Sequence, residues 1–136
     1  MTAGQRPGTP QSGRSEATAG PFHFARQVAE IDEWLDAEPS KTYRKQPVAQ
    51  HWARVAKASE EVGEAIEKLI AWTGQNPRKP QRDEAYGEML DELADVALTG
   101  ILAIQHFTKD VGMTQAYLTH RLARLHARME DVRRAA

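Results

Sequence analysis

Two pairs of carboxylates at helical spacing are the residues of this chain that best support chemistry. Glu61 and Glu64 form the first pair, and Glu92 and Asp95 form the second after a proline-containing break. A step of three residues along an α-helix returns a side chain to nearly the same face, so each pair directs two oxygen ligands to one patch. If the two helices fold back antiparallel, four carboxylates converge. A hard cation such as Mg²⁺, or Mn²⁺ as a substitute, would relieve their repulsion.

The charge pattern around the second pair supports this interpretation. Between positions 83 and 108 the sequence has no lysine or arginine, and it has six acidic residues: Asp83, Glu84, Glu88, Asp91, Glu92 and Asp95. A helix N-terminus favours the first two, because its partial charge is positive. A solvated acidic face is the alternative interpretation, but solvated helix faces normally interleave charges of both signs. The pattern therefore favours a bound cation.

The elements that would position these carboxylates are helices. Apolar residues recur at helical spacing within residues 24–35, 48–69, 89–107 and 118–129, and no window alternates long enough to be a strand. Pro47 suits a first helical position, Gly74 suits a left-handed cap, and we expect Asp83 and Thr114 to cap the third and fourth helices. The loop 73–82 contains Gly74, Pro77 and Pro80 and so connects two helices. The sequence predicts an all-α, antiparallel helical bundle.

One helix carries a near-heptad apolar seam opposite its carboxylates. The seam has alternating four- and three-residue steps through Val48, Trp52, Val55, Ser59, Val62, Ile66 and Leu69. Such a pattern is typical of helices that associate, and the simplest product is a symmetric dimer. On a helical wheel Glu61 and Glu64 lie on the other side of this helix.

Length and composition limit the number of domains, the partners and the cellular compartment. The 136 residues suffice for one domain, with residues 1–20 expected to be a disordered tail and residues 21–136 a helical domain. A basic linker is expected at 41–45. The net charge of −1 gives no general attraction to nucleic acid or membrane, and no apolar run approaches the ~20 residues of a membrane span. The absence of cysteine excludes disulfides and fits the cytoplasm.

The two carboxylate segments together resemble a known family. Residues 57–65, KASEEVGEA, and 91–98, DELADVAL, look like the EExxE…ExxD signature of MazG-like proteins, which are all-α nucleoside triphosphate pyrophosphohydrolases. The resemblance covers residues 48–107. It implies Mg²⁺-dependent cleavage of a nucleotide to its monophosphate and pyrophosphate, in a homodimer or homotetramer. It also implies four metal ligands: Glu61, Glu64, Glu92 and Asp95.

Residues around the expected ligands are candidates for further roles. Glu60 is positioned to orient or deprotonate the attacking water, or is an exposed glutamate. Lys57 is expected either to touch a phosphate or to pair with Glu61. Four further residues are candidates for substrate binding: the loop cations Arg78, Lys79 and Arg82, and Trp72, which could stack on a base. The alternatives are that the loop is only solvated and that the tryptophan binds no ligand.

The motif lacks one residue that relatives carry, and other functions compete with the one it implies. Relatives often carry a Lys or Asn after ExxD, where this sequence offers only Gln105 or His106. A ferritin-like di-iron site needs Glu-x-x-His pairs, which the chain lacks. A catalytically degenerate helical interaction protein is the main alternative, favoured by the seam and by an arginine-rich fourth helix. Nucleic-acid binding is disfavoured by the net negative charge.

Overall fold

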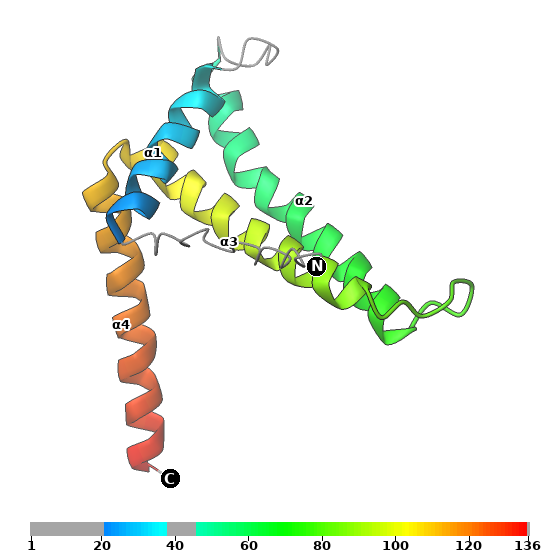
Figure 1. Ribbon diagram of the computed structural model, residues 1–136. Coiled ribbons are helices and arrows are strands. Elements are labelled where there is room, and N and C mark those ends of the chain that lie inside the picture. Colours follow the sequence, from blue (N-terminus) through cyan, green and yellow to red (C-terminus); the bar gives the residue numbers. More distant parts are fainter. Residues whose placement is uncertain (1–20, 38–45, 136) are drawn as a thin grey trace, which may run out of the picture.

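The computed structural model describes residues 21–37 and 46–135, and these residues form four helices with no strand among them. The helices are α1 (Pro21–Ala37), α2 (Pro47–Thr73), α3 (Ala85–Thr108) and α4 (Val111–Ala135), as Figure 1 shows. The all-α prediction is therefore confirmed. The expected tail (1–20) and basic linker (41–45) lie outside the described residues.

A hairpin of α2 and α3 forms the main body of the molecule. The two helices run antiparallel and pack side by side along the hairpin (Figure 1). Pro47 is the first residue of α2, and Gly74 ends that helix with φ 68°, as predicted. The Gly74 amide donates to the carbonyl of Ile70, and the Arg82 amide donates to the carbonyl of Ala71 at 3.0 Å. These bonds tie the connecting loop back to the end of α2.

Two of the expected helix caps are wrong. Asp83 does not cap α3, because the residue before that helix is Glu84, which makes no side-chain cap. Thr114 does not begin α4, because the chain turns earlier, at Lys109, whose φ is 50°. Asp110 caps α4 instead, since its Oδ1 accepts from the Met113 amide at 2.7 Å. Thr114 is buried and donates to Gln105 Oε1 at 2.8 Å, which joins α4 to α3.

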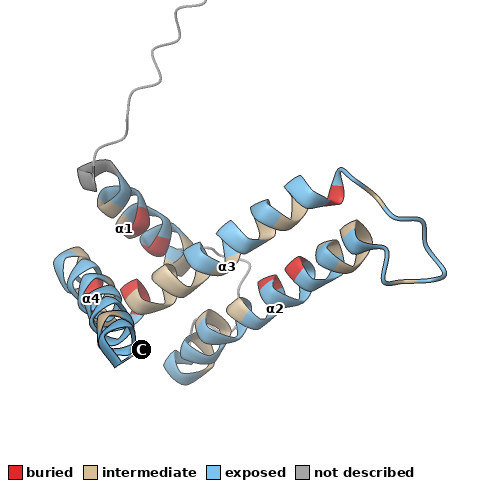
Figure 2. Ribbon diagram, turned by 90° about the horizontal axis from the view of Figure 1, so that it is seen from below, coloured by how far each residue is buried: buried red, intermediate tan, exposed pale blue. Residues whose placement is uncertain are grey.

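Few apolar side chains are buried within one copy of the chain. Among the described residues only Val28, Ala65 and Ala85 are buried hydrophobics, and Figure 2 shows correspondingly little red. The predicted seam of α2 faces away from α3, and Trp52 is 72% exposed. The reason is that α2 turns its other face, with Glu61 and Ala65, toward α3.

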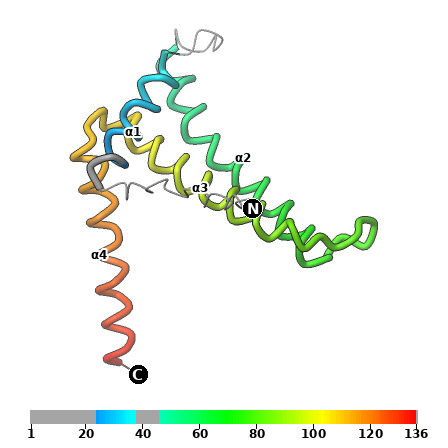
Figure 3. Tube along the Cα trace, viewed as in Figure 1, coloured from blue at the N-terminus to red at the C-terminus, as the bar shows by residue number. Residues whose placement is uncertain are grey.

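The outer helices cross one end of the hairpin. α1 contacts α3 and α4, and α4 then extends away from the other helices toward its C-terminus (Figure 3). None of the described helices is long and apolar enough to cross a membrane.

Candidate metal centre

Three of the four predicted metal ligands converge between α2 and α3. One carboxylate oxygen from each of Glu61, Glu92 and Asp95 lies within 4.8 Å of the other two. The antiparallel hairpin brings the pairs together, as the spacing predicted. Glu61 is buried with 7% exposure, Glu92 is half-buried and Asp95 is exposed, so the group opens to solvent on one side.

Glu64, the fourth predicted ligand, is outside this close group, but the negative charge of the group shifts its pKa. Repulsion from Glu92 raises the pKa of Glu64, and desolvation and the charge of Glu61 raise it further. A raised carboxylate pKa is what a cluster of like charges produces. Glu64 is itself exposed, so its side chain can change rotamer without displacing buried neighbours.

Lys57 is the cation that faces this cluster. Its Nζ lies 2.7 Å from Glu61 Oε1 and 3.0 Å from Glu60 Oε1. The hydrogen bond to Glu61 raises the pKa of Lys57, so the side chain stays charged at neutral pH. Of the described residues, only Lys57 forms an ion pair with these carboxylates. One ammonium against Glu60 and the four predicted ligands leaves the cluster negatively charged.

The donor set fits a hard divalent cation. All of its members are carboxylates, the ligands that Mg²⁺ and Mn²⁺ prefer, and they lack the sulfur or imidazole donors that favour softer metals. The buried carboxylate of Glu61 also needs more compensation than its single lysine, because it lies beside Glu92 and Asp95. The arrangement can therefore hold an ion with solvent access for a phosphate.

A cavity adjoins this cluster along the hairpin. It has a volume of about 220 Å³ and is lined by side chains of α1, α2 and α3, among them Leu35, Arg54, Lys57 and Leu102. Thr99, also in its wall, donates from Oγ1 to the backbone carbonyl of Asp95 at 2.6 Å. Lys57 thus connects the cavity to the carboxylates, and the lining combines apolar walls with two cations.

The predicted loop cations do not contact the carboxylate cluster. Arg82 donates to Glu84 at 3.0 Å and to Glu88 at 2.6 Å, and the hydrogen bond to Glu84 raises the pKa of Arg82. Lys79 lines a different cavity, between the end of α2 and the loop. The backbone amide of Arg78 donates to the Asn76 side chain, which shapes the loop tip. No contact in the described chain joins these cations to the carboxylates.

The aromatic and polar candidates also have structural partners. The centroid of the Trp72 ring lies 4.9 Å from that of Tyr86, so the two rings pack α2 against α3 at the end of the hairpin. Gln105 and His106 are buried at the other end of α3. Eleven residues separate Asp95 from His106, or about 16 Å along a helix, so neither residue replaces the missing Lys or Asn at the carboxylates.

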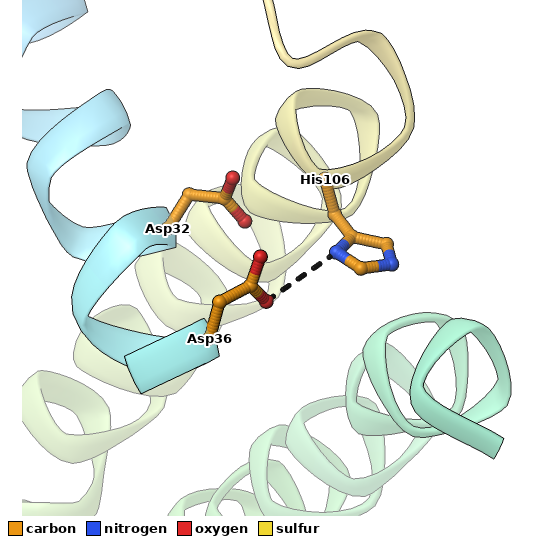
Figure 4. Close-up of side chains that lie close together, drawn as sticks. All are labelled: Asp32, Asp36 and His106. Atoms are coloured by element: carbon orange, nitrogen blue, oxygen red, sulfur yellow. Dashed lines mark ion pairs between the residues drawn. The ribbon is translucent and has the colours of Figure 1, made fainter. Parts of the chain in front are cut away.

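A second polar cluster, which the sequence did not reveal, joins α1 to α3. Asp32 and Asp36 of α1 face His106 of α3, and Figure 4 shows the three side chains together. Lys109 Nζ lies 2.7 Å from Asp32 and 2.6 Å from Asp36, while Arg54 of α2 lies 2.8 Å from Asp36. The two cations balance the two carboxylates, so this cluster has no excess charge for a metal to neutralise.

The pKa values of this second cluster agree with a structural role. Burial raises the pKa of Asp36, but its bonds with Lys109 and Arg54 outweigh burial and leave the pKa below its usual value. Burial and the Lys109 ammonium lower the pKa of His106, which is therefore neutral at pH 7. Its Nε2 lies 2.9 Å from His51 Nδ1 of α2. The cluster thus ties three helices together.

Comparison with family models, with curated proteins and with solved structures gives no match to this chain.

Proposed function

We propose that this chain is a Mg²⁺-dependent nucleoside triphosphate pyrophosphohydrolase, which converts an NTP or dNTP to the monophosphate and pyrophosphate. The convergence of Glu61, Glu92 and Asp95 from two antiparallel helices carries this proposal. The EExxE…ExxD resemblance supports it as well, because three of the motif's four ligand positions are the residues that converge. The cysteine-free sequence fits an enzyme of the cytoplasm.

Glu61, Glu92 and Asp95 would hold the ion, with Glu64 completing the set. Mg²⁺ bound there would offset the charge of the phosphates and polarise the phosphorus under attack. Water then attacks the α-phosphorus, the bond from that phosphorus to the α,β-bridging oxygen breaks, and pyrophosphate leaves. Glu60 is exposed beside the cluster, where it accepts the proton of the water.

The cavity beside the carboxylates is the proposed place of the nucleoside. Its apolar walls, Leu35 and Leu102, suit a base, and Arg54, Lys57 and Thr99 supply polar groups near the phosphate end. Lys57 would exchange part of its contact with Glu61 for a phosphate oxygen. We expect Trp72, Arg78, Lys79 and Arg82 to contribute less to substrate binding than Lys57, since their contacts lie within the hairpin end.

The alternative function is a non-catalytic helical association protein of the same fold. The exposed seam of α2 favours it, because that surface needs a partner whether or not nucleotide is cleaved. We expect a homodimer or homotetramer under either function.

Product analysis tests the proposal. The protein is incubated with a panel of NTPs and dNTPs and Mg²⁺ in ¹⁸O-labelled water. Monophosphate carrying ¹⁸O, together with unlabelled pyrophosphate, is the expected result, because water attacks the α-phosphorus. Asp95→Asn keeps the shape but removes a ligand charge and should lower kcat by orders of magnitude.

Asp91→Asn is the matched control, since Asp91 is an exposed acid of α3 outside the close group and its replacement should leave turnover intact. Orthophosphate as the first product would overturn the assignment, and so would full activity of the Asp95→Asn protein. No turnover with any nucleotide would favour the association protein.

A further inference from the structure

From Leu118 onward α4 carries an apolar seam. Leu118 lines a cavity with α1, and the seam residues beyond it are exposed. The α4 seam follows alternating four- and three-residue steps through Leu118, Leu122, Leu125, Met129 and Val132. Leu122 is 69% exposed and Val132 is 70% exposed, and every residue from 119 to 129 is exposed. A helix of this length is marginal alone in water, so its regular seam indicates a partner.

Charges beside the α4 seam exclude a second α4 as that partner. In heptad positions, Arg121 and Arg128 border the seam on one side, and His126 and Arg133 border it on the other. Two paired α4 helices would place arginine against arginine in the parallel and in the antiparallel arrangement. Like charges across such a seam oppose association. The partner surface must be apolar and neutral or acidic at its borders.

The seam of α2 is a surface of that kind. The large side chains of this seam are exposed, among them Trp52 and Ile66. The accessible residues that border its middle are small: Ala56, Ala58 and Gly63. Small borders let another helix approach closely. Arginine side chains from that helix are long enough to pass them and reach Glu67 on the outer face of α2.

The α4 seam and the α2 seam of one chain lie apart. Figure 1 shows that the C-terminal half of α4 runs away from the hairpin, so α4 is not folded onto its own α2. A second copy offers both surfaces at once. We propose that the α4 seam of each copy packs on the α2 seam of the other, giving a two-fold symmetric dimer with two identical contacts. The dimer does not depend on the proposed catalysis.

A mixing experiment with two variants tests this exchange. Leu125→Lys places a charge in the α4 seam, and Ile66→Lys places one in the α2 seam. Both side chains are about half exposed, at 47% and 50%, so replacement should leave each copy folded. Ala127→Lys, on the far side of α4, is the control and should keep the wild-type mass.

Light scattering at tens of micromolar should give a dimer for the wild type and a monomer for each seam variant alone. The equimolar mixture of the two variants should recover a dimer, because the intact α4 of one still meets the intact α2 of the other. Circular dichroism of each variant checks that the helices are retained.

The other outcomes contradict the exchange in distinct ways. A Leu125→Lys protein that remains dimeric would indicate pairing of α2 with α2, and a dimeric Ile66→Lys protein would indicate pairing of α4 with α4. A monomeric wild type or a monomeric mixture would also overturn the proposal. None of these results bears on nucleotide cleavage, which is measured separately by pyrophosphate release.

Discussion

Glu64 shows how a single carboxylate reports on the state of the whole cluster. It is exposed, yet the charge of Glu92, aided by desolvation and by Glu61, raises its pKa. The physical consequence is that ionised Glu64 costs the folded protein stability. With a divalent cation at the cluster, ionised Glu64 would stabilise the folded protein, because attraction to the ion replaces repulsion between carboxylates.

We predict that Glu64→Gln raises the melting temperature in a chelating buffer at neutral pH and lessens the stabilisation by Mg²⁺. The sign follows from the raised pKa: the folded protein binds the Glu64 proton more tightly than the unfolded chain does, so ionisation lowers stability. The gain should disappear as pH falls below 4.5, the ordinary pKa of the group, because Glu64 is then protonated in both the folded and the unfolded protein.

Thermal melts of both proteins between pH 4 and pH 7.5 measure this difference. Asp91→Asn, which changes an exposed acid of α3 outside the close group, is the matched control and should change little. A Glu64→Gln protein less stable than the wild type in chelator would show that Glu64 is not repelled in the fold.

At the scale of elements, α1 is held to the hairpin largely by charge. Asp32 is 2% exposed, and its Oδ1 has no hydrogen-bond donor in proper geometry, although Arg54 lies 3.3 Å away. Oδ2 accepts from Lys109 at 2.7 Å. Few apolar side chains are buried under α1. The ion pairs of Asp32 with Lys109 and Arg54 therefore contribute a larger share of the free energy that holds α1 to the hairpin than they would beside a larger core.

We predict that Asp32→Ala lowers the free energy of unfolding by about 2–4 kcal/mol, because it leaves Arg54 without one of its buried partners. Arg54 has only 12% of its side chain exposed, whereas Lys109 is half exposed and recovers water. Urea denaturation measures the loss. Asp131→Ala removes an exposed ion pair with Arg134 and should cost under about 0.5 kcal/mol. Equal effects of the two substitutions would contradict the role given to Asp32.

The whole molecule exposes most of its large apolar side chains. Of the twenty exposed in the described residues, ten belong to the α2 seam or the α4 seam and the others lie mostly on α1 and α3. A single copy therefore resembles part of an assembly more than a finished core. Stability should therefore depend on protein concentration as well as on bound ions.

We predict that millimolar Mg²⁺ or Mn²⁺ raises the melting temperature, because the ion binds the folded cluster and not the unfolded chain. At ten times its dissociation constant the ion adds about 1.4 kcal/mol of stability. Glu92→Ala should abolish this shift, while Glu88→Ala, one turn earlier on α3 and paired with Arg82, should retain it. The measurement is a thermal melt with and without ion at fixed protein concentration. No shift in the wild type would leave the cluster without a metal.

The sequence by itself determined the helices and the convergence of carboxylates. Proline and glycine at Pro47 and Gly74 mark backbone positions that few other residues suit, and a three-residue step fixes which side chains share a helix face. With one antiparallel hairpin assumed, the spacing predicts that all four carboxylates converge. Glu61, Glu92 and Asp95 do, and Glu64 lies outside their close group. These backbone preferences and helical spacings depend only on residues close together in the chain, so they can be predicted from the sequence.

Only the tertiary structure decided what lies across the helices. Asp32 and Lys109 are 77 positions apart, and nothing in their neighbourhoods signals that they pair. Thr114 looked like a helix cap because Asp110, four residues earlier, was not recognised as the better one. The α2 seam predicted a helix that associates, but a seam shows only that a helix needs a partner. Whether that partner is in the same chain depends on how the helices pack, which their periodicity does not specify.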